Sequence, residues 1–572
     1  MKTFLKFACA LACAIPLFCS CSGSIAVFPA DGSRNVNPDT RLVLTFNSDG
    51  TPVKAPAVQG EAVPMLGAVR IEGETTVPVP SSGKIRVFDC DARLAVDSLD
   101  LSVPAGPAAR RKEIPGTPYA TTPYSYGRTS MPTNRDTRPG TPSYFAAEPN
   151  QEGFQLNIIG GFTDAFHFYP VILEGRRATI SLHNNVLEYG HRYRVEIEEA
   201  VFGKALSWTF TCKAKAPEGN CLTVNADGSG DFSTLQGALD FIPDWSGAAW
   251  TIDLSEGDFT ELVYARNKSG ITIRGAGMEK TRIHYANNEV FNPHPLKVKT
   301  HETPGTFPQR RAPFTLDNCR DISLEDFTVA TDLKGQAEGI MLNGERFSMR
   351  RVHVVGDGDA VQANGSVYME ECEVDGGGDT FLGRGPLFAY RCTLRNGGGP
   401  FTWVRNTEGV HGDVFVECSF ESTGPFPADF GRSFTNNVST YPYAEVAVID
   451  CRLRNIAPEG WDASQLRPGS QLMLEYNSTD ADSGAPSDVS RRNPQSRQLR
   501  MPEDSALISC YRNPAWVLDA DQNLLRSGNQ LSCFSCQAKQ SLQTLQLCHC
   551  EPFSKPSETK RSNSVFSSCC CS

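Results

Sequence analysis

The chain has 572 residues, of which 40% are hydrophobic and 21% are charged, so it has ample material for a folded core. Its 54 Lys and Arg residues against 65 Asp and Glu residues give a net charge of −11. This balance argues against a nucleic-acid partner, because affinity for nucleic acid comes mainly from neutralising phosphates. The 49 glycines and 38 prolines favour a turn-rich β architecture over helices.

The first residues predict export. Lys2 and Lys6 precede an apolar run over 7–18, which is typical of a signal peptide (1–20) and too short for a stable membrane span. The run ends in Cys-Ser-Cys, similar to a bacterial lipobox whose lipidated residue is Cys21. We therefore expect an exported, membrane-anchored lipoprotein, in the periplasm or at the cell surface. Secretion without a lipid is the alternative.

Residues 25–213 show many short alternating segments separated by turns, such as Arg41-Leu-Val-Leu-Thr-Phe and Tyr193-Arg-Val-Glu-Ile. This pattern predicts a β-sandwich, and it resembles the immunoglobulin-like modules that precede catalytic domains in secreted bacterial carbohydrate enzymes. An insertion at about 104–152, rich in Pro, Thr, Ser and Arg, is expected to be a long solvated loop.

From residue 219 an internal repeat begins. Six windows of eight residues alternate apolar and polar side chains, and their starts are 25, 20, 20, 26 and 33 residues apart. One such strand per turn of about 20 residues indicates an all-β, right-handed parallel β-helix over 219–520. The longer gaps after the fourth and fifth windows predict loops that wall a cleft. The windows start at Ile322, Phe347, Val367, Leu387, Asp413 and Val446.

The cysteines fall into three groups. Four of the 20 cysteines lie in the signal region, eight in the last 63 residues, and the other eight in the body of the chain between them. Cys372, Cys392, Cys418 and Cys451 share the sixth window position, so we predict a stacked column inside the β-helix, where free Cys acts as a small hydrophobe. The segment 525–572 carries irregularly spaced cysteines in polar sequence, which is a poor zinc pattern and predicts a disordered tail.

One pair of carboxylates is aligned by the repeat. Asp359 lies 12 residues after Phe347, and Asp379 lies 12 residues after Val367, so the two are one 20-residue coil apart. Neighbouring strands are about 4.8 Å apart, which brings the two side chains near contact. Two such carboxylates cannot both ionise cheaply, so the pair suits one ionised nucleophile and one proton donor.

The motifs around this pair resemble the pectin methylesterase (pectinesterase) family. They are Gln336-Ala-Glu-Gly-Ile-Met-Leu, Gly356-Asp-Gly-Asp-Ala-Val, Gly376-Gly-Gly-Asp-Thr-Phe-Leu-Gly and Phe430-Gly-Arg-Ser-Phe. Gly257-Asp-Phe-Thr-Glu is similar to a further family motif. The resemblance covers about 219–520, and it implies a carboxylic ester hydrolase that uses no metal or other cofactor.

The resemblance implies a role for each matched residue. Asp379 would attack the methyl ester carbonyl, and Asp359 would protonate departing methanol and then activate water. Arg432 would hold Asp379 ionised, and Gln336 would stabilise the oxyanion. Phe434 would replace the family's tryptophan as a platform for sugar packing.

The resemblance also implies the partners. The substrate would be methyl-esterified homogalacturonan (pectin), bound by a protein expected to be a monomer tethered to the membrane by its lipid. Arg384, with Arg395 and Arg405, is placed near the cleft and is hypothesised to offset repulsion between an acidic protein and a uronate polymer.

Three alternatives remain open on the sequence. Asp357, Asp359, Asp375 and Asp379 resemble a set of hard-cation ligands, which would suit a Ca²⁺-dependent, pectate-lyase-like enzyme. An esterase for another acyl group is the second alternative. The third is a glycan-binding homologue with impaired catalysis, because Gly358 stands where the family has a second oxyanion glutamine.

Overall fold

The computed structural model describes residues 25–47, 50–55, 67–106, 153–160, 165–289, 291–292, 310–432, 441–462 and 471–518. The predicted signal peptide with Cys21, nearly all of the insertion, Phe434 and the cysteine-rich tail lie outside these residues.

Two sheets form the N-terminal part of the described chain. Their buried residues, such as Leu44 in one sheet and Val87 and Val195 in the other, belong to one apolar cluster, so the two sheets share a core as in a sandwich. The immunoglobulin-like resemblance itself stays a prediction. The first sheet has the order β1 (Ile25–Phe28), β3 (Leu42–Phe46), β11 (Arg177–Ile180), β10 (Val171–Gly175), β5 (Val69–Thr75) and β4 (Val53–Lys54). The second has the order β2 (Ser33–Val36), β13 (Leu206–Cys212), β12 (Arg192–Ile197), β6 (Lys84–Asp89) and β7 (Leu94–Asp100).

Smaller elements accompany the sandwich. A two-stranded sheet pairs β8 (Leu156–Ile158) with β9 (Ala165–His167), and the short helix α1 (Glu199–Phe202) precedes β13.

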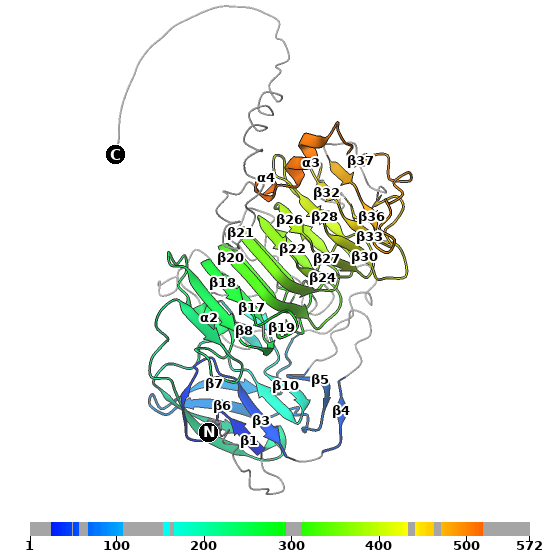
Figure 1. Ribbon diagram of the computed structural model, residues 1–572. Helices are drawn as coiled ribbons and strands as arrows, with labels where there is room; N and C mark the ends of the chain where they lie inside the picture. The colour runs from blue at the N-terminus through cyan, green and yellow to red at the C-terminus, as the bar shows by residue number, and fades with distance from the viewer. Residues whose placement is uncertain are drawn as a thin grey trace, which may run out of the picture. The chain divides into compact units, whose positions relative to one another are not determined.

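The rest of the chain forms a parallel β-helix. Its strands belong to one 24-stranded sheet in which each strand pairs with those of the next coil, and the coils follow one another along the domain (Figure 1). The first eight strands are β14 (Cys221–Val224), β15 (Trp250–Leu254), β16 (Gly257–Thr260), β17 (Val263–Arg266), β18 (Ser269–Arg274), β19 (Thr281–Tyr285), β20 (Phe314–Thr331) and β21 (Ile340–Val355).

The remaining strands build the later coils. Those of the central coils are β22 (Val361–Asn364), β23 (Val367–Glu370), β24 (Glu373–Gly376), β25 (Phe381–Gly383), β26 (Leu387–Tyr390), β27 (Thr393–Asn396), β28 (Thr402–Val404), β29 (Asp413–Val416) and β30 (Ser419–Ser422). The last are β31 (Gly431–Arg432), β32 (Glu445–Ile449), β33 (Arg452–Arg454), β34 (Trp461–Asp462), β35 (Leu472–Tyr476), β36 (Thr479–Asp480) and β37 (Arg497–Gln498).

The register of the strands confirms the predicted repeat. Each predicted window start is the pairing partner of the next one, for example Phe347 with Val367 and Val367 with Leu387. The sequence period is therefore the period of the coil. The apolar side chain of each window is repeated on the next coil, and the coils bury one continuous core.

The cysteine column is also confirmed. Cys372, Cys392, Cys418 and Cys451 are free thiols with no more than 1% of their surface exposed. Each interacts with the next one along the column, so the four thiols are stacked core residues.

Helices cover both ends of the β-helix. Helix α2 (Leu235–Phe241) lies against β14, β15 and β17, and the hydroxyl of its N-cap residue Thr234 accepts a hydrogen bond from the backbone N–H of Gly237. The carboxylate of Asp39, from the sandwich, accepts hydrogen bonds from the backbone of Ser233 and Thr234. The sandwich therefore caps the same helix that closes the β-helix.

Helix α3 (Ser505–Tyr511) lies towards the other end, against β32, and helix α4 (Pro514–Val517) lies against β26. In the part of the chain that the structure describes, no helix combines the length and apolar character needed to cross a bilayer.

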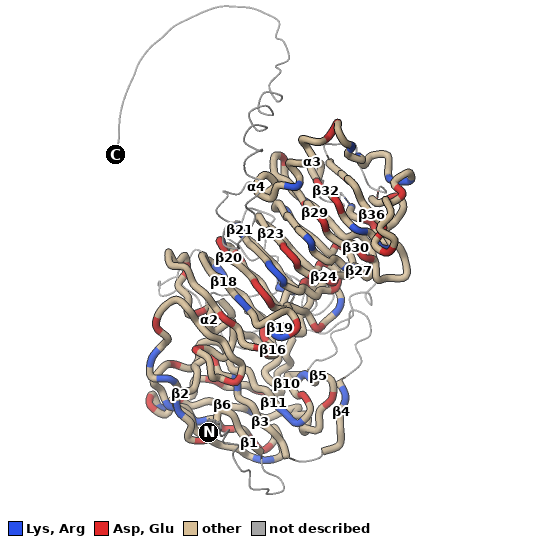
Figure 2. The backbone as a smooth tube through the Cα atoms, in the orientation of Figure 1, with Lys and Arg blue, Asp and Glu red and all other residues tan. Residues whose placement is uncertain are grey.

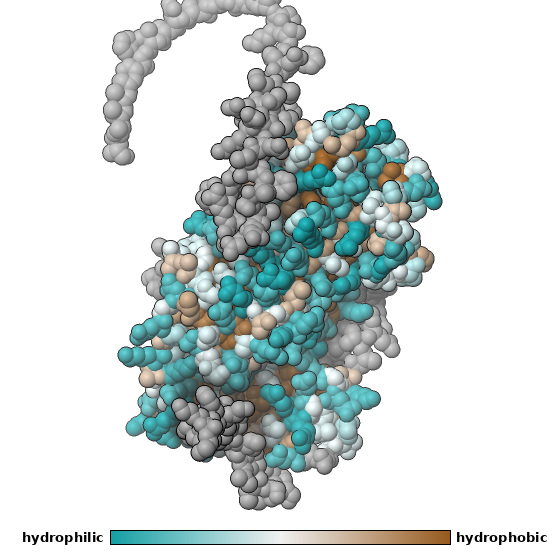
Figure 3. Space-filling model, in the orientation of Figure 1, coloured by the Kyte–Doolittle hydropathy of each residue, from teal (hydrophilic) through white to brown (hydrophobic). Residues whose placement is uncertain are grey.

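The visible outer face of the β-helix is polar. Lys and Arg alternate with Asp and Glu across its strands (Figure 2), and hydrophilic side chains dominate the same face in space-filling view (Figure 3). Opposite charges pair across adjacent coils on this face. For example, Nε of Arg350 lies 3.1 Å from Oε2 of Glu370, and such cross-strand pairs stabilise a sheet modestly.

Candidate active site

Asp359 and Asp379 occupy equivalent places on adjacent coils. Each lies two residues before a strand, and the two strands pair in register, Val361 with Phe381. The two carboxyl groups are close enough for the charge of Asp359 to raise the pKa of Asp379. The side chains of Asp359 and Asp379 are 10% and 15% exposed, so both carboxyl groups are mostly buried but keep some surface in contact with solvent.

Asp379 is held by Arg432. Nε of Arg432 donates to Oδ1 of Asp379 over 2.8 Å, and Nη2 donates to Oδ2, so the pair is bidentate. Burial raises the pKa of Asp379 to about 6, with Arg432 opposing and Asp359 adding to the rise. The backbone φ of Asp379 is 47°, a left-handed conformation that Asp tolerates better than most residues and that is often found at functional sites.

Asp359 is held by a different arginine, Arg311, which precedes β20 and lies two coils before Asp359. Nη2 of Arg311 is 2.7 Å from Oδ2 of Asp359. The same guanidinium binds Glu338 through Nε at 2.6 Å and Glu289 through Nη1 at 2.7 Å. One buried cation therefore serves three carboxylates.

The three carboxyl groups around Arg311 would carry more negative charge than one guanidinium can balance, so we expect at least one of them to hold a proton. Glu338 is completely buried, and burial raises its pKa, with the charge of Asp359 contributing and Arg311 opposing the rise. Its second oxygen, Oε2, has no hydrogen-bond partner. Glu338 is thus the member of the cluster best suited to carry a proton near neutral pH.

Gln336 belongs to the same group. Its Oε1 accepts from Nη1 of Arg311 over 3.1 Å. The neighbouring Ala337 pairs with Asp357 in an isolated bridge, which holds the Gln336 segment against the loop that carries Asp359. With its carbonyl oxygen bonded to Arg311, the other polar group of the Gln336 side chain is its amide nitrogen, a hydrogen-bond donor.

Gly358 has a structural reason for its identity. Its φ is 83°, and a Cβ there would meet only Cα and N of Gln336 at 3.7 and 3.8 Å. A side chain would fit in space but would strain the left-handed backbone. Glycine is therefore the residue that this loop conformation favours at the position where the resemblance places a second glutamine.

An aromatic residue that the sequence analysis missed lies beside the acids. Trp403 pairs in register with Leu382 on one coil and with Arg432 on the next. Its ring lies under two guanidinium groups, with centroid distances of 4.2 Å to Arg432 and 4.6 Å to Arg405. The predicted platform, Phe434, lies outside the described residues, so Trp403 is the aromatic surface that the structure places at this site.

Two of the predicted cleft arginines come together and one does not. Arg384 and Arg405 directly follow the paired residues Gly383 and Val404, so they are neighbours on adjacent coils. Arg395 instead forms ion pairs with Glu373 and Asp375, at 2.9 and 3.2 Å.

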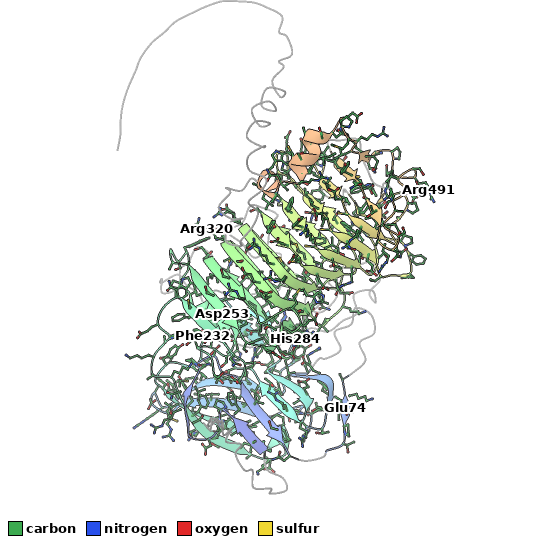
Figure 4. The ribbon with its side chains drawn as sticks, in the orientation of Figure 1. Glu74, Phe232, Asp253, His284, Arg320 and Arg491 are labelled. Carbon is green, nitrogen blue, oxygen red and sulfur yellow. The ribbon has the colours of Figure 1, made fainter. Side chains whose placement is uncertain are left out.

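The four carboxylates of the calcium alternative have separate partners. Asp375 accepts from His353 at 2.7 Å and from Arg395, and Asp357 accepts from the backbone N–H of Gly335. Among the described residues, the groups of ligand atoms close enough to hold an ion are Glu72, His284 (labelled in Figure 4) and Asp332, and Asp89, Asp91 and His191. Neither group includes these four carboxylates.

The fold and the site together define a parallel β-helix protein with an Arg-held pair of aspartates. Residues 221–399 match the family model described as Pectinesterase. This stretch is therefore similar to the pectinesterase family, which is the family that the motifs resemble.

Solved structures of pectin methylesterases are similar to part of the chain. The enzyme from carrot has 18% sequence identity and a TM-score of 0.43, covering 53% of this chain and 95% of its own. The enzyme from Aspergillus niger has 18% identity and a TM-score of 0.41, covering 52% and 97%. PemA from Erwinia chrysanthemi has 16% identity and a TM-score of 0.40, covering 53% and 98%.

Arg311, Glu338 and Trp403 are the residues at this site that sequence reasoning missed. The one available signal was Glu338, an acid within the apolar run that follows Gln336. Arg311 and Trp403 stand in no motif. They reach the site because the coil stacks residues that are tens of positions apart in sequence.

Proposed function

We propose that the β-helix domain removes methyl esters from galacturonate residues of pectin, releasing methanol and leaving free carboxylates. The observation that carries the proposal is the pair of aspartates one coil apart, each bound by its own arginine. This activity would take part in the breakdown or modification of plant cell-wall pectin.

Asp379 is the nucleophile in this proposal. Its ionised carboxylate attacks the ester carbonyl carbon, and the resulting oxyanion is met by the amide of Gln336. Collapse of the tetrahedral intermediate breaks the bond to the methoxy group and leaves a mixed anhydride with Asp379. The bidentate contact with Arg432 supports this role, because it favours the ionised, correctly oriented form.

Asp359 is the acid and base. It gives a proton to the departing methoxide, and then takes a proton from the water that hydrolyses the anhydride. Glu338, which shares Arg311 with Asp359, supports the first step by keeping a proton within the cluster. Glu338 is a positioning residue here, since it acts through Arg311 and Asp359.

The test is methanol release from highly methylated pectin, with EDTA present. We expect release by the wild type and a loss of about 10³-fold or more for Asp379→Asn. Asp258→Asn, at an exposed position in β16, is the matched control and should release methanol at the wild-type rate. Equal rates for Asp379→Asn and the wild type would refute the assigned nucleophile.

Gly358 supports a second candidate function, that of a protein that binds a glycan without turning it over. The absence of one oxyanion donor typically costs a factor on the order of 10²–10³ in rate. Binding of pectin by the wild type without methanol or any other acyl product, and unchanged in Asp379→Asn, would favour this candidate over the esterase.

We also propose that the protein is exported and anchored by lipid on Cys21, and that it acts as a monomer. The basic, apolar and Cys-Ser-Cys segments at the start of the chain support the anchor. Metabolic labelling with a fatty acid should mark the wild type and leave Cys21→Ser unlabelled, and light scattering of the lipid-free protein should give the mass of one chain.

A further inference from the structure

One short segment of the β-helix contacts both the N-terminal sandwich and the residues that hold the aspartate pair. It follows β19, and we call it the linking segment. Its described residues near the site are no more than 8% exposed, and they are Asn287, Asn288, Glu289, Phe291 and Asn292. Buried amide and carboxyl groups such as these need hydrogen-bond partners, so their partners show what the segment does.

The hydrophobic core of the sandwich holds one end of the linking segment. Phe291 belongs to the apolar cluster of the sandwich, together with Tyr285 and Leu333 of the β-helix. The Phe291 ring stacks on Tyr169, with ring centroids 4.8 Å apart and planes 6° from parallel. A Cβ at Gly106 would lie only 2.7 Å from Cε2 of Phe291, so the ring is tightly packed on that side as well. The sandwich and the β-helix therefore share a core at this segment.

His167 of β9 makes three hydrogen bonds to the same end. Its backbone N–H donates to Oδ1 of Asn292 over 2.8 Å, and its backbone carbonyl accepts from Nδ2 of Asn292 over 3.2 Å. Nδ1 of the His167 ring lies 2.7 Å from the carbonyl oxygen of Phe291. Since a carbonyl can only accept, Nδ1 carries the proton and donates. Burial lowers the pKa of His167 to about 4, so the ring is neutral at pH 7.

A chain of amides continues from Asn292 to the backbone on both sides of Arg311. Nδ2 of Asn292 also donates to Oδ1 of Asn287 over 2.9 Å. Nδ2 of Asn287 in turn donates to the backbone carbonyls of Arg310 and Ala312, over 2.8 and 3.0 Å. These two carbonyls flank Arg311 in sequence. One buried amide therefore fixes the backbone from which the Arg311 side chain extends.

The middle of the linking segment contacts the active-site residues directly. Oε2 of Glu289 lies 2.7 Å from Nη1 of Arg311, and the backbone N–H of Glu289 donates to the carbonyl oxygen of Gln336 over 3.1 Å. Nδ2 of Asn288 donates to the carbonyl oxygen of Lys334 over 2.8 Å. The segment therefore holds the central cation of the buried cluster and the backbone that carries the glutamine.

The same two domains also meet away from this segment. Nδ2 of Asn37, in the sandwich, donates to Oγ of Ser233 over 3.1 Å and to the carbonyl oxygen of Gly230 over 3.3 Å. Asn37 is 1% exposed, so it is buried much as Asn287 is. Its partners precede helix α2, whereas those of Asn287 flank Arg311. Asn37 is therefore a matched comparison, a buried amide that joins the domains elsewhere.

We propose that the N-terminal sandwich is required for the geometry of the catalytic site. Through His167 and the linking segment it positions Arg311, and Arg311 positions the acid–base residue Asp359. The inference rests on the proposed function, since it names what the sandwich contributes to that reaction. His167, Asn292 and Asn287 are positioning residues, because they act through Arg311.

Kinetics of the full chain distinguish positioning from simple docking of the domains. Asn287→Ala removes the donor to the backbone around Arg311 and should lower kcat for highly methylated pectin about tenfold or more, with KM within about twofold of the wild type. Asn287→Ser, which keeps one donor, should give an intermediate kcat. Asn37→Ala loses a buried amide between the same domains and should keep the wild-type kcat. Equal kcat values for Asn287→Ala and the wild type would overturn the positioning role.

His167 allows a test from within the sandwich. His167→Phe removes the ring donor to Phe291 and should lower kcat about threefold or more. His167→Asn keeps a donor near the place of Nδ1 and should restore most of the lost rate. Thermal unfolding of each variant verifies that it is folded. Losses of the same size in both variants would show that the ring only fills space, and would overturn the hydrogen-bonded link.

Urea unfolding of the full chain tests the link without any turnover. Arg311→Met should change the unfolding equilibrium constant by a factor at least about threefold smaller in the Asn287→Ala background than in the wild type. In the Asn37→Ala background the factor should be undiminished. Strict additivity of Asn287→Ala and Arg311→Met would overturn the proposal.

The outcomes separate this inference from the proposed function. Non-additive stability of Asn287→Ala and Arg311→Met, without methanol release by the wild type, would leave the positioning of Arg311 standing and remove the esterase. Methanol release with the same kcat in the wild type, Asn287→Ala and Asn37→Ala would leave the esterase standing and remove the contribution of the sandwich.

Discussion

Nη2 of Arg311 lies 2.7 Å from Oδ2 of Asp359, and this is the contact that ties the acid–base candidate to a buried cluster of charges. Arg311 is the central cation of that cluster, because Glu289 and Glu338 bind to the same guanidinium. The cluster joins four residues that lie more than 20 positions apart in sequence, so its integrity should matter for stability as well as for chemistry.

Replacing Arg311 by Met should lower the free energy of unfolding by about 3–5 kcal/mol, because the change leaves buried carboxylates without their cation. Arg391→Met, which breaks an exposed pair with Glu417, should cost less than about 1 kcal/mol. Urea unfolding of the full chain measures both. Adding Glu338→Gln to Arg311→Met should recover part of the loss, and strict additivity of the two changes would contradict the cluster.

Glu338→Gln should change how stability depends on pH. Burial raises the pKa of Glu338 above its ordinary value of 4.5, so the folded state holds this proton more tightly than the unfolded state. The resulting stabilisation is complete below pH 4.5 and is lost as the pH rises through the higher folded-state pKa. The melting temperature of the wild type should therefore fall over this window more than that of Glu338→Gln. Parallel curves would show that Glu338 does not carry the proton.

The rate should depend on the ionisation of Asp379. Since the pKa of Asp379 is raised to about 6 and the nucleophile must be ionised, kcat/KM for pectin should fall as the pH drops below about 6. Arg432 lowers this pKa, so Arg432→Met should move the acid limb to higher pH in addition to lowering the rate. Arg391→Met should leave the limb in place. A limb that stays fixed or moves to lower pH in Arg432→Met would contradict the pairing.

Restoring the family's glutamine at position 358 should not be neutral. Gly358 has a φ of 83°, and a non-glycine residue in this left-handed conformation costs about 1–2 kcal/mol. Gly358→Gln and Gly358→Ala should both lose about this much stability in urea unfolding. Gly398→Ala, where a Cβ meets nothing within 4 Å and φ is not left-handed, is the control. Equal stability of the two alanine variants would show that the backbone strain is absent.

Trp403→Ala should weaken the use of pectin. The ring is the aromatic surface between Arg405 and Arg432, and stacking on an aromatic face is a main source of sugar and cation contact energy. We expect kcat/KM to fall about tenfold or more. Trp245→Ala, at a 43% exposed tryptophan next to Arg320, should keep the wild-type value. The same loss in both variants would indicate a general effect on folding.

Much of the architecture was readable from the sequence because a β-helix repeats in sequence as it does in space. The windows that start at Phe347, Val367 and Leu387 pair as predicted, and the cysteine column is buried as predicted. The alignment of Asp359 with Asp379 follows from the same period. The helices at the two ends were not foreseen, since each is a single short element outside the repeat.

The sequence by itself determined the fold class of the second half, because the fold depends on the period of the repeat. It also pointed to the aspartate pair, with Arg432 and Gln336, because these residues stand in local motifs. Only the tertiary structure decided which charges meet. Arg311 reaches Asp359 across 48 positions of chain, and Arg384 meets Arg405 without an acid between them. Such contacts depend on how coils of unequal length stack, and the loops that make coils unequal carry no periodic signal.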